Sequence, residues 1–175
     1  MPVSTLVATA GAANANAYVT LAVAEQYHLD RPAVGSTWED ADTDQKVAAI
    51  LWATKLLDRY FEWNGSVVDT TQNLLWPRLE LYKVNGSVID STTIPDEIQW
   101  ATAEFARQLL VEDRVGDSDV ETQGVKLIKV GPIRIDFKDS VFSKPIPDAV
   151  VSLIPSKWGY LYKDNGIRER ELRRA

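Results

Sequence analysis

The sequence predicts a mainly α-helical protein, a small helical bundle with a late β-hairpin and extended arms at both ends. Apolar residues recur at three- and four-residue spacing over residues 43–60, which is the period of a helix with one buried face. At Ile94–Glu97 a proline and two acids stand where a helix begins. From about residue 124 the pattern alternates with a period of two, which is typical of strands.

The length and composition favour one domain without the common catalytic or metal-binding groups. A chain of 175 residues with 45% hydrophobic content can bury one ordinary core. It has no cysteine and one histidine, His28, which excludes the usual zinc, iron–sulfur, thiol-nucleophile and Ser-His-Asp sites. No apolar run approaches the roughly 20 residues that span a bilayer. We therefore expect a soluble protein made in a reducing cytoplasm, with no signal peptide.

The first half should hold an arm and two helices. Residues 1–19 are small and polar without a helix cap, so we expect an extended N-terminal arm or a short strand. A helix should begin after Thr20, whose hydroxyl suits an N-cap, and end near His28. Residues 31–37 contain proline and glycine and predict a loop. The helix over residues 43–60 is the clearest in the sequence.

The middle of the chain combines tight turns with a further helix. Asn64-Gly65 and Asn85-Gly86 predict turns, because both residue types tolerate a positive φ. The helix that begins at Ile94–Glu97 should end near Glu112. Three tryptophans in this part of the chain lie in segments that we expect to be buried: Trp63, Trp76 and Trp100.

The last third should contain the hairpin, a short helix and a tail. Residues 125–130 and 133–137 are β-prone and flank Gly131-Pro132, which predicts a hairpin over about residues 124–138. A short helix should begin at Pro147 and stop at Pro155. These assignments give a helical domain over residues 20–155 and a basic, aromatic tail over residues 156–175.

The charge divides unevenly between body and tail. The whole chain carries −6, whereas residues 156–175 hold six basic and three acidic side chains and carry +3. The body therefore carries −9 and would repel a nucleic-acid backbone. Any acidic partner should meet the tail.

The acidic clusters and the histidine do not form a catalytic or metal-binding pattern. One acidic cluster has part of the spacing of a calcium loop but lacks its glycine and distal glutamate, so we expect a solvated loop at Asp113, Asp117, Asp119 and Glu121. A second precedes the 43–60 helix, where acids favour the positive end of the helix dipole: Glu39, Asp40, Asp42 and Asp44. His28 has no partner His or Cys nearby and should cap a helix or lie on the surface. We therefore expect no enzyme.

The tail carries the candidate binding residues. In an extended chain Trp158, Tyr160 and Tyr162 would share one face, bracketed by cations. Such a face could dock on a protein partner, fold back on its own domain, or stack on unpaired bases. Docking is favoured, because three acids within the tail weaken its attraction to phosphate. The candidate docking residues are Lys157, Trp158, Tyr160, Tyr162, Lys163, Arg168, Arg170, Arg173 and Arg174.

Several segments together resemble a group of tailed-phage neck proteins. The most specific are Trp76-Pro77-Arg78 and Val130–Ile133, and residues 13–19 and Ile94-Pro95 add to them. The resemblance runs from about Ala13 to Ile154. Members are often labelled DnaT-like single-stranded-DNA-binding proteins, while their place in phage genomes and particles is that of head–tail adaptors.

The resemblance implies a structural role in the virion. It implies a helical domain assembled in the host cytoplasm as a dodecameric ring beneath the portal, with a C-terminal extension that reaches the portal. A downstream neck or tail protein would bind the other side, and genomic double-stranded DNA would pass through without sequence-specific binding. No cofactor, membrane contact or catalytic residue is implied. The alternative is a single-stranded-DNA-binding protein of replication or restart.

Overall fold

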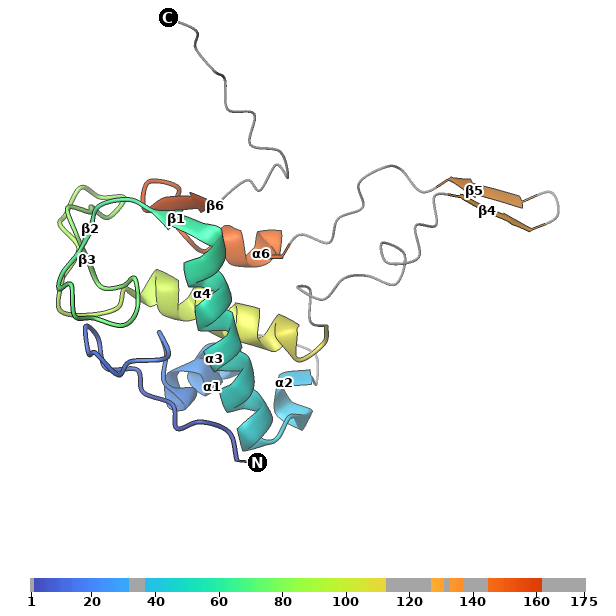
Figure 1. The fold of residues 1–175 in the computed structure, drawn as a ribbon, viewed down its shortest axis with the longest axis horizontal. Helices are drawn as coiled ribbons and strands as arrows, with labels where there is room; N and C mark the ends of the chain where they lie inside the picture. The colour runs from blue at the N-terminus through green and yellow to red at the C-terminus, as the bar shows by residue number, and fades with distance from the viewer. Residues whose placement is uncertain (1, 32–36, 113–126, 131–132, 137–144, 162–175) are drawn as a thin grey trace, which may run out of the picture.

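The computed structural model describes residues 2–31, 37–112, 127–130, 133–136 and 145–161 (Figure 1). Within these ranges the fold is mixed: five helices accompany short antiparallel strand pairs, so it is less purely helical than predicted. The helices are α1 (Leu21–Leu29), α2 (Thr37–Asp40), α3 (Thr43–Tyr60), α4 (Asp96–Leu109) and α6 (Asp148–Val151). The strands are β1 (Phe61–Trp63), β2 (Ser66–Val67), β3 (Arg78–Leu79), β4 (Leu127–Val130), β5 (Ile133–Asp136) and β6 (Gly159–Leu161).

Helix α3 is the central element of the core. Its predicted bounds are confirmed, and a capping box begins it, since Asp42 accepts from the Gln45 N–H and Gln45 accepts from the Asp42 N–H. Its apolar face packs against α4, which crosses it in Figure 1. The residues that it buries are Val47, Ala49, Ile50, Leu51, Ala53, Thr54, Leu56 and Leu57.

Helices α1, α4 and α6 also begin where the sequence predicts, whereas α2 was not predicted. The Thr20 hydroxyl accepts from the Val23 N–H at 3.3 Å and starts α1. Helix α4 follows Pro95 and ends at Leu109, slightly before the predicted end. Helix α6 follows Pro147 but lasts one turn only.

The N-terminal segment is packed on the body instead of forming a free arm. Residues 2–19 form no helix or strand, yet Tyr18 and Val19 are buried in the core. The Asn16 side chain accepts from the Val7 N–H at 2.7 Å and donates to the Thr5 carbonyl at 2.9 Å. These bonds fold the segment back on itself, so the expectation of an extended arm is wrong.

The end of the predicted helical domain lies further along the chain. Strand β6 pairs antiparallel with β1, with Leu161 opposite Phe61 and Gly159 opposite Trp63. The two strands lie together at one end of the molecule (Figure 1). The boundary predicted after Pro155 is therefore too early, because the folded part includes Leu161.

The late hairpin is confirmed. Strands β4 and β5 pair antiparallel, with Val130 opposite Ile133. Figure 1 draws this hairpin apart from the helices. The acidic loop predicted at Asp113, Asp117, Asp119 and Glu121 lies outside the described residues.

Both predicted Asn-Gly turns are confirmed. Gly65 and Gly86 have φ of +72° and +85°, which favours glycine. A Cβ atom at Gly65 would lie 2.2 Å from the Leu79 carbonyl oxygen. The close approach of β3 is therefore a second reason for glycine at this position.

Candidate interaction surfaces

The Trp-Pro-Arg segment, which carries much of the resemblance, is structural. Trp76 and Arg78 are both buried. The Arg78 guanidinium donates to the backbone carbonyls of four residues, at 2.7–3.3 Å: Trp63, Asn64, Gly65 and Leu75. One arginine therefore holds the turn after β1 against the chain before β3.

Trp158 completes a cluster of aromatic rings at the strand end of the molecule. Its ring centroid lies 5.6 Å from that of Trp76, which lies 5.5 Å from that of Trp63. The Trp158 Nε1–H donates to the Tyr82 carbonyl at 2.8 Å, and the Trp158 carbonyl accepts from the Asn64 N–H at 2.8 Å. Trp158 is 1% exposed and belongs to the core.

This placement corrects the predicted docking face. The Trp158 N–H donates to the Pro155 carbonyl in a turn, so strand geometry starts only at Gly159 and the alternation with Tyr160 does not hold. Tyr160 is exposed, and its hydrogen bond to Glu62 raises the pKa of its hydroxyl. Lys157 is exposed. The remaining docking candidates lie outside the described residues: Tyr162, Lys163, Arg168, Arg170, Arg173 and Arg174.

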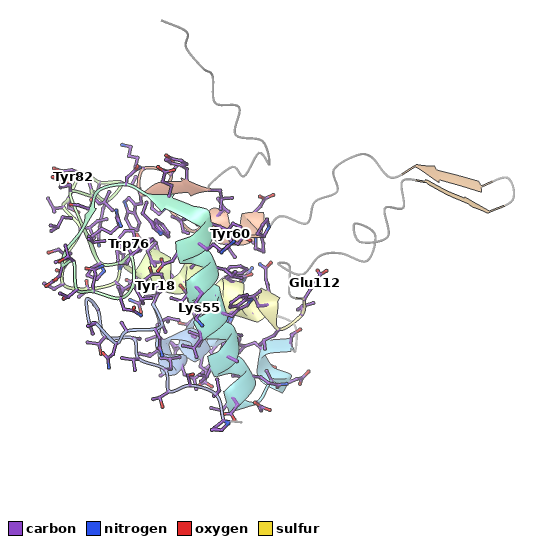
Figure 2. All side chains as sticks on the ribbon, viewed as in Figure 1. Tyr18, Lys55, Tyr60, Trp76, Tyr82 and Glu112 are labelled. Carbon is purple, nitrogen blue, oxygen red and sulfur yellow. The ribbon has the colours of Figure 1, made fainter. Side chains whose placement is uncertain are left out.

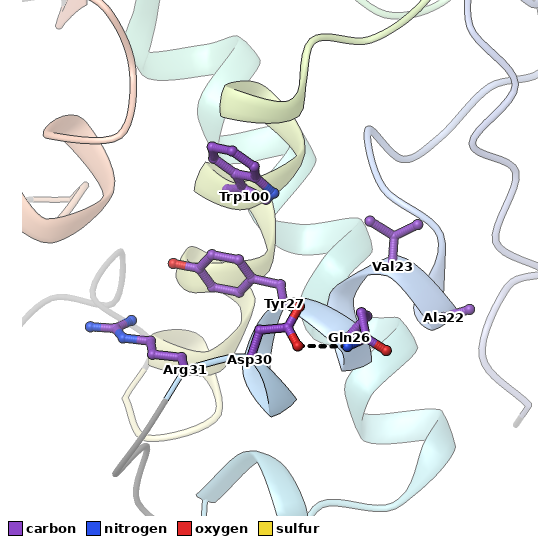
Figure 3. Close-up of a pocket in the computed structure, with 7 residues that line it drawn as sticks. All are labelled: Ala22, Val23, Gln26, Tyr27, Asp30, Arg31 and Trp100. Atoms are coloured by element: carbon purple, nitrogen blue, oxygen red, sulfur yellow. Dashed lines mark hydrogen bonds between the residues drawn. The ribbon is translucent and has the colours of Figure 1, made fainter.

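A cleft of about 640 Å³ opens between α1 and α4 (Figure 3). It is lined by Ala22, Val23, Gln26, Tyr27, Asp30, Arg31 and Trp100, and we call it the α1–α4 cleft. Trp100 is 42% exposed and faces the cleft, so the prediction that it is buried is wrong. The buried face of α4 instead follows Ile98, Ala101 and Phe105. An exposed tryptophan over a hollow is typical of a binding surface.

Buried charges fix one wall of this cleft. Glu104 is buried and pairs with Arg31 and with Arg107, the latter at 2.7 Å. Burial alone would raise the pKa of Glu104, but the hydrogen bonds from Arg107 and Gln108 and the charges of both arginines lower it. The ionised carboxylate thus holds Arg31 at the cleft.

His28 is buried, which corrects its predicted capping or surface role. Its Nε2 lies 3.1 Å from the Ala103 carbonyl, and its ring packs 4.5 Å from that of Trp38. Burial lowers the pKa of His28 to about 4. The imidazole is therefore neutral near pH 7 and joins α1 to α4.

Asp58 is a second perturbed group in the core. It accepts from the Tyr18 hydroxyl and from the Leu75 N–H, the latter at 3.2 Å. Burial raises the pKa of Asp58 to about 6, although these hydrogen bonds lower it. Asp58 thereby ties α3 to the N-terminal segment and to the chain before Trp76.

These two groups predict opposite effects of pH on stability. The folded pKa of Asp58 is raised, so its contribution is present below about pH 4 and lost as the pH rises through 6. That of His28 is lowered, so its contribution is present above pH 6.5 and lost as the pH falls through 4. As the pH falls from 6.5 to 4, the free energy of unfolding of Asp58→Asn should decrease by about 2–3 kcal/mol relative to that of wild type. That of His28→Gln should increase relative to wild type by a similar amount. Urea unfolding across this range measures both differences, and variant curves parallel to wild type would contradict the assignment.

The outer face of α3 presents another exposed tryptophan. Trp52 lines a shallow groove of about 440 Å³ with Leu109 and Leu110 at the end of α4. One and two turns further along α3, Lys55 and Arg59 are exposed on the same face, and Figure 2 labels Lys55. We call Trp52, Lys55 and Arg59 the α3 stripe. An aromatic ring with two cations suits stacking on a base with phosphate contacts.

A short hairpin over residues 82–88 projects from the body. Tyr82 pairs with Val88, the Lys83 N–H donates to the Ser87 carbonyl at 2.8 Å, and the Asn85-Gly86 turn closes it. Tyr82, Val84 and Val88 are exposed, with Val84 at 90%. We call this segment the 82–88 hairpin.

The acidic residues before the 43–60 helix lie in α2 or at the start of α3. Asp42 caps α3 and Asp44 lies in its first turn, as predicted, while Glu39 and Asp40 lie in α2, which the sequence did not predict. Within the described ranges, no three His, Asp or Glu side chains gather closely enough to hold a metal ion. No helix among the same residues is long and apolar enough to cross a membrane.

Comparison with known proteins gives one result. A family model described as "Putative DnaT-like ssDNA binding protein" matches residues 5–160, a range that ends within β6 and includes Trp158. The comparisons with curated proteins and with solved structures found no match. Because the matched range covers most of the chain, the protein belongs to this DnaT-like family.

Proposed function

We propose that the protein is a structural head–tail adaptor of a tailed bacteriophage, without catalytic activity. It would form a ring below the portal, surround the DNA channel and dock to the portal through its C-terminal tail. The downstream neck or tail protein would bind the opposite side of the ring. The proposal places the protein in the virion after assembly in the host cytoplasm.

The observation that carries the proposal is the anchoring of the tail. Strand β6 is paired with β1, and Trp158 is buried directly before it, so the chain is fixed to the domain up to Leu161. Residues 162–175 hold five basic and three acidic side chains, which leaves −8 on residues 1–161. A basic tail joined to an acidic body suits docking on an acidic partner. In a ring, many equivalent tails would add their weak affinities.

The acidic body also suits a channel for DNA. A surface of net negative charge repels the phosphate backbone, so a duplex can pass without adhering. Separate exposed apolar features on a closed core provide surfaces for neighbouring subunits. These features are the α1–α4 cleft, the α3 stripe with its groove, and the 82–88 hairpin.

Single-stranded-DNA binding is the second candidate, favoured by the family description and by the α3 stripe. It predicts an affinity that falls steeply with salt and that drops when Trp52 is replaced by alanine. Base stacking on one ring contributes about 1–3 kcal/mol. The net charge of −8 on residues 1–161 opposes this function.

A binding experiment separates the two candidates. Full-length protein and a version that ends after Leu161 are tested in parallel against purified portal rings from the same phage and against labelled single-stranded DNA at near-physiological salt. We expect the full-length protein to bind the portal, the shortened one to lose this binding, and neither to retain DNA. Cutting after Leu161 keeps β6 and Trp158, so both versions should unfold at the same temperature. Tight, salt-sensitive DNA binding without portal binding would overturn the proposal.

A further inference from the structure

The 82–88 hairpin is rigid and exposes apolar side chains. Its base is fixed because Trp158 Nε1–H donates to the Tyr82 carbonyl, and the Ile89 N–H donates to the Leu81 carbonyl at 3.0 Å. At the tip, the Asn85 side chain accepts from Ser87 N–H at 3.1 Å. The tip therefore presents Val84 to solvent in a fixed conformation. A partner that binds it would lose little conformational entropy from ordering the hairpin.

The α1–α4 cleft offers a hollow of complementary chemistry. Its walls are aliphatic and aromatic, with Val23 on one side and Tyr27 and Trp100 on the other (Figure 3). Its volume is within the range of pockets that enclose several side-chain groups. The Glu104–Arg31 pair and the Gln26–Asp30 hydrogen bond of 2.7 Å hold its rim in place.

The two features carry one pair of opposite charges, since the cation that also lines the cleft, Arg31, is already paired with Glu104. Lys83 is exposed beside Val84 on the hairpin, and Asp30 is exposed at the rim of the cleft. A lysine that enters the cleft can pair with this carboxylate or lie over the Trp100 ring. Such a local pairing matters because two acidic bodies otherwise repel each other.

We propose that the 82–88 hairpin of one copy inserts into the α1–α4 cleft of the next, which deepens the ring assembly proposed above and rests on it. In Figure 2, Tyr82 lies at the strand end of the molecule, whereas Figure 1 places α1 towards the opposite end. One molecule can therefore offer its hairpin to one neighbour and its cleft to another. Such a head-to-tail contact builds a ring when the rotation between copies closes.

Two surface variants test the contact by complementation. Val84→Asp places a charge at the apolar tip of the hairpin and leaves the cleft unchanged. Trp100→Ala removes the aromatic wall of the cleft and leaves the hairpin unchanged. Each alone should lose self-association, measured by sedimentation velocity with and without portal rings. An equal mixture should form a dimer, because one intact hairpin meets one intact cleft. Val111→Asp, at an exposed valine beyond α4, is the matched control and should assemble like wild type.

Cross-linking keeps the test decisive if assembly in solution is weak. The chain has no cysteine, so Val84→Cys and Val23→Cys can be placed on separately purified copies and oxidised together. We expect a mixed disulfide dimer well above the yield with Val111→Cys in place of Val23→Cys. Yields equal to this control, or oligomers that persist in both surface variants, would overturn the contact. Portal binding without the cross-link would reject this interface alone, whereas the cross-link without portal binding would reject the adaptor function.

Discussion

Replacing Trp158 with alanine should lower the free energy of unfolding by about 3–5 kcal/mol, although the residue lies close to the end of the chain. The ring is 1% exposed and fills the space beside Trp76. The variant would leave a cavity there and would remove the donor to the Tyr82 carbonyl. For a chain of this size the loss corresponds to a melting temperature lower by about 10 °C. Thermal and urea unfolding followed by circular dichroism measure it.

Tyr160→Ala is the matched control for this prediction. Tyr160 lies two residues after Trp158, in strand β6, but is exposed, so its removal should change stability by at most about 0.5 kcal/mol. A small effect at Trp158, similar to that at Tyr160, would mean that the C-terminal strand does not belong to the domain. The anchoring of the tail, on which the proposed function rests, would then be lost.

Replacing Arg78 with methionine should destabilise the protein by about 3 kcal/mol or more. The substitution keeps an unbranched side chain but leaves the carbonyls of Trp63, Asn64, Gly65 and Leu75 without their common donor. Each buried carbonyl left without a partner costs about 1–3 kcal/mol, less where water can enter. Arg78→Lys should recover only part of this loss, because an ammonium group cannot reproduce the planar fork of a guanidinium.

The control is Arg59→Met, at an exposed arginine on α3, which should stay within about 0.5 kcal/mol of wild type. Urea midpoints for the three variants give the comparison. If Arg78→Lys were as stable as wild type, the charge of Arg78 would matter and its geometry would not. The structural explanation of the Trp-Pro-Arg segment would then fail.

The local pattern of the sequence predicted the helices well. Helix α3 has an uninterrupted apolar period and a capping box, and the N-cap threonine and the prolines mark where α1, α4 and α6 begin. The hairpin of β4 and β5 follows from alternation about Gly131-Pro132. These signals act over a few residues, so a single sequence contains them.

The features that the sequence missed depend on contacts between distant residues. Strands β1 and β6 have three residues each and lie far apart in the chain, too short for a periodic signal. Their pairing, with the turn before Gly159, is what buries Trp158 and breaks the predicted row of rings. Trp100 is exposed because it lies on the opposite side of α4 from Ile98, Ala101 and Phe105, which form the buried face. A Cβ atom at Gly159 would lie 2.8 Å from the Glu62 carbonyl oxygen, and this glycine is the one local sign of the close pairing.

The central claim is that the protein is a component of the virion neck, and the composition of the particle tests it most directly. Purified particles of the phage that encodes the chain would be analysed by quantitative mass spectrometry, with the portal protein as internal standard. The adaptor function predicts the chain in the particles in about the same copy number as the portal. Its absence from particles, with abundant protein in the infected cell, would contradict the claim and favour a role in DNA replication.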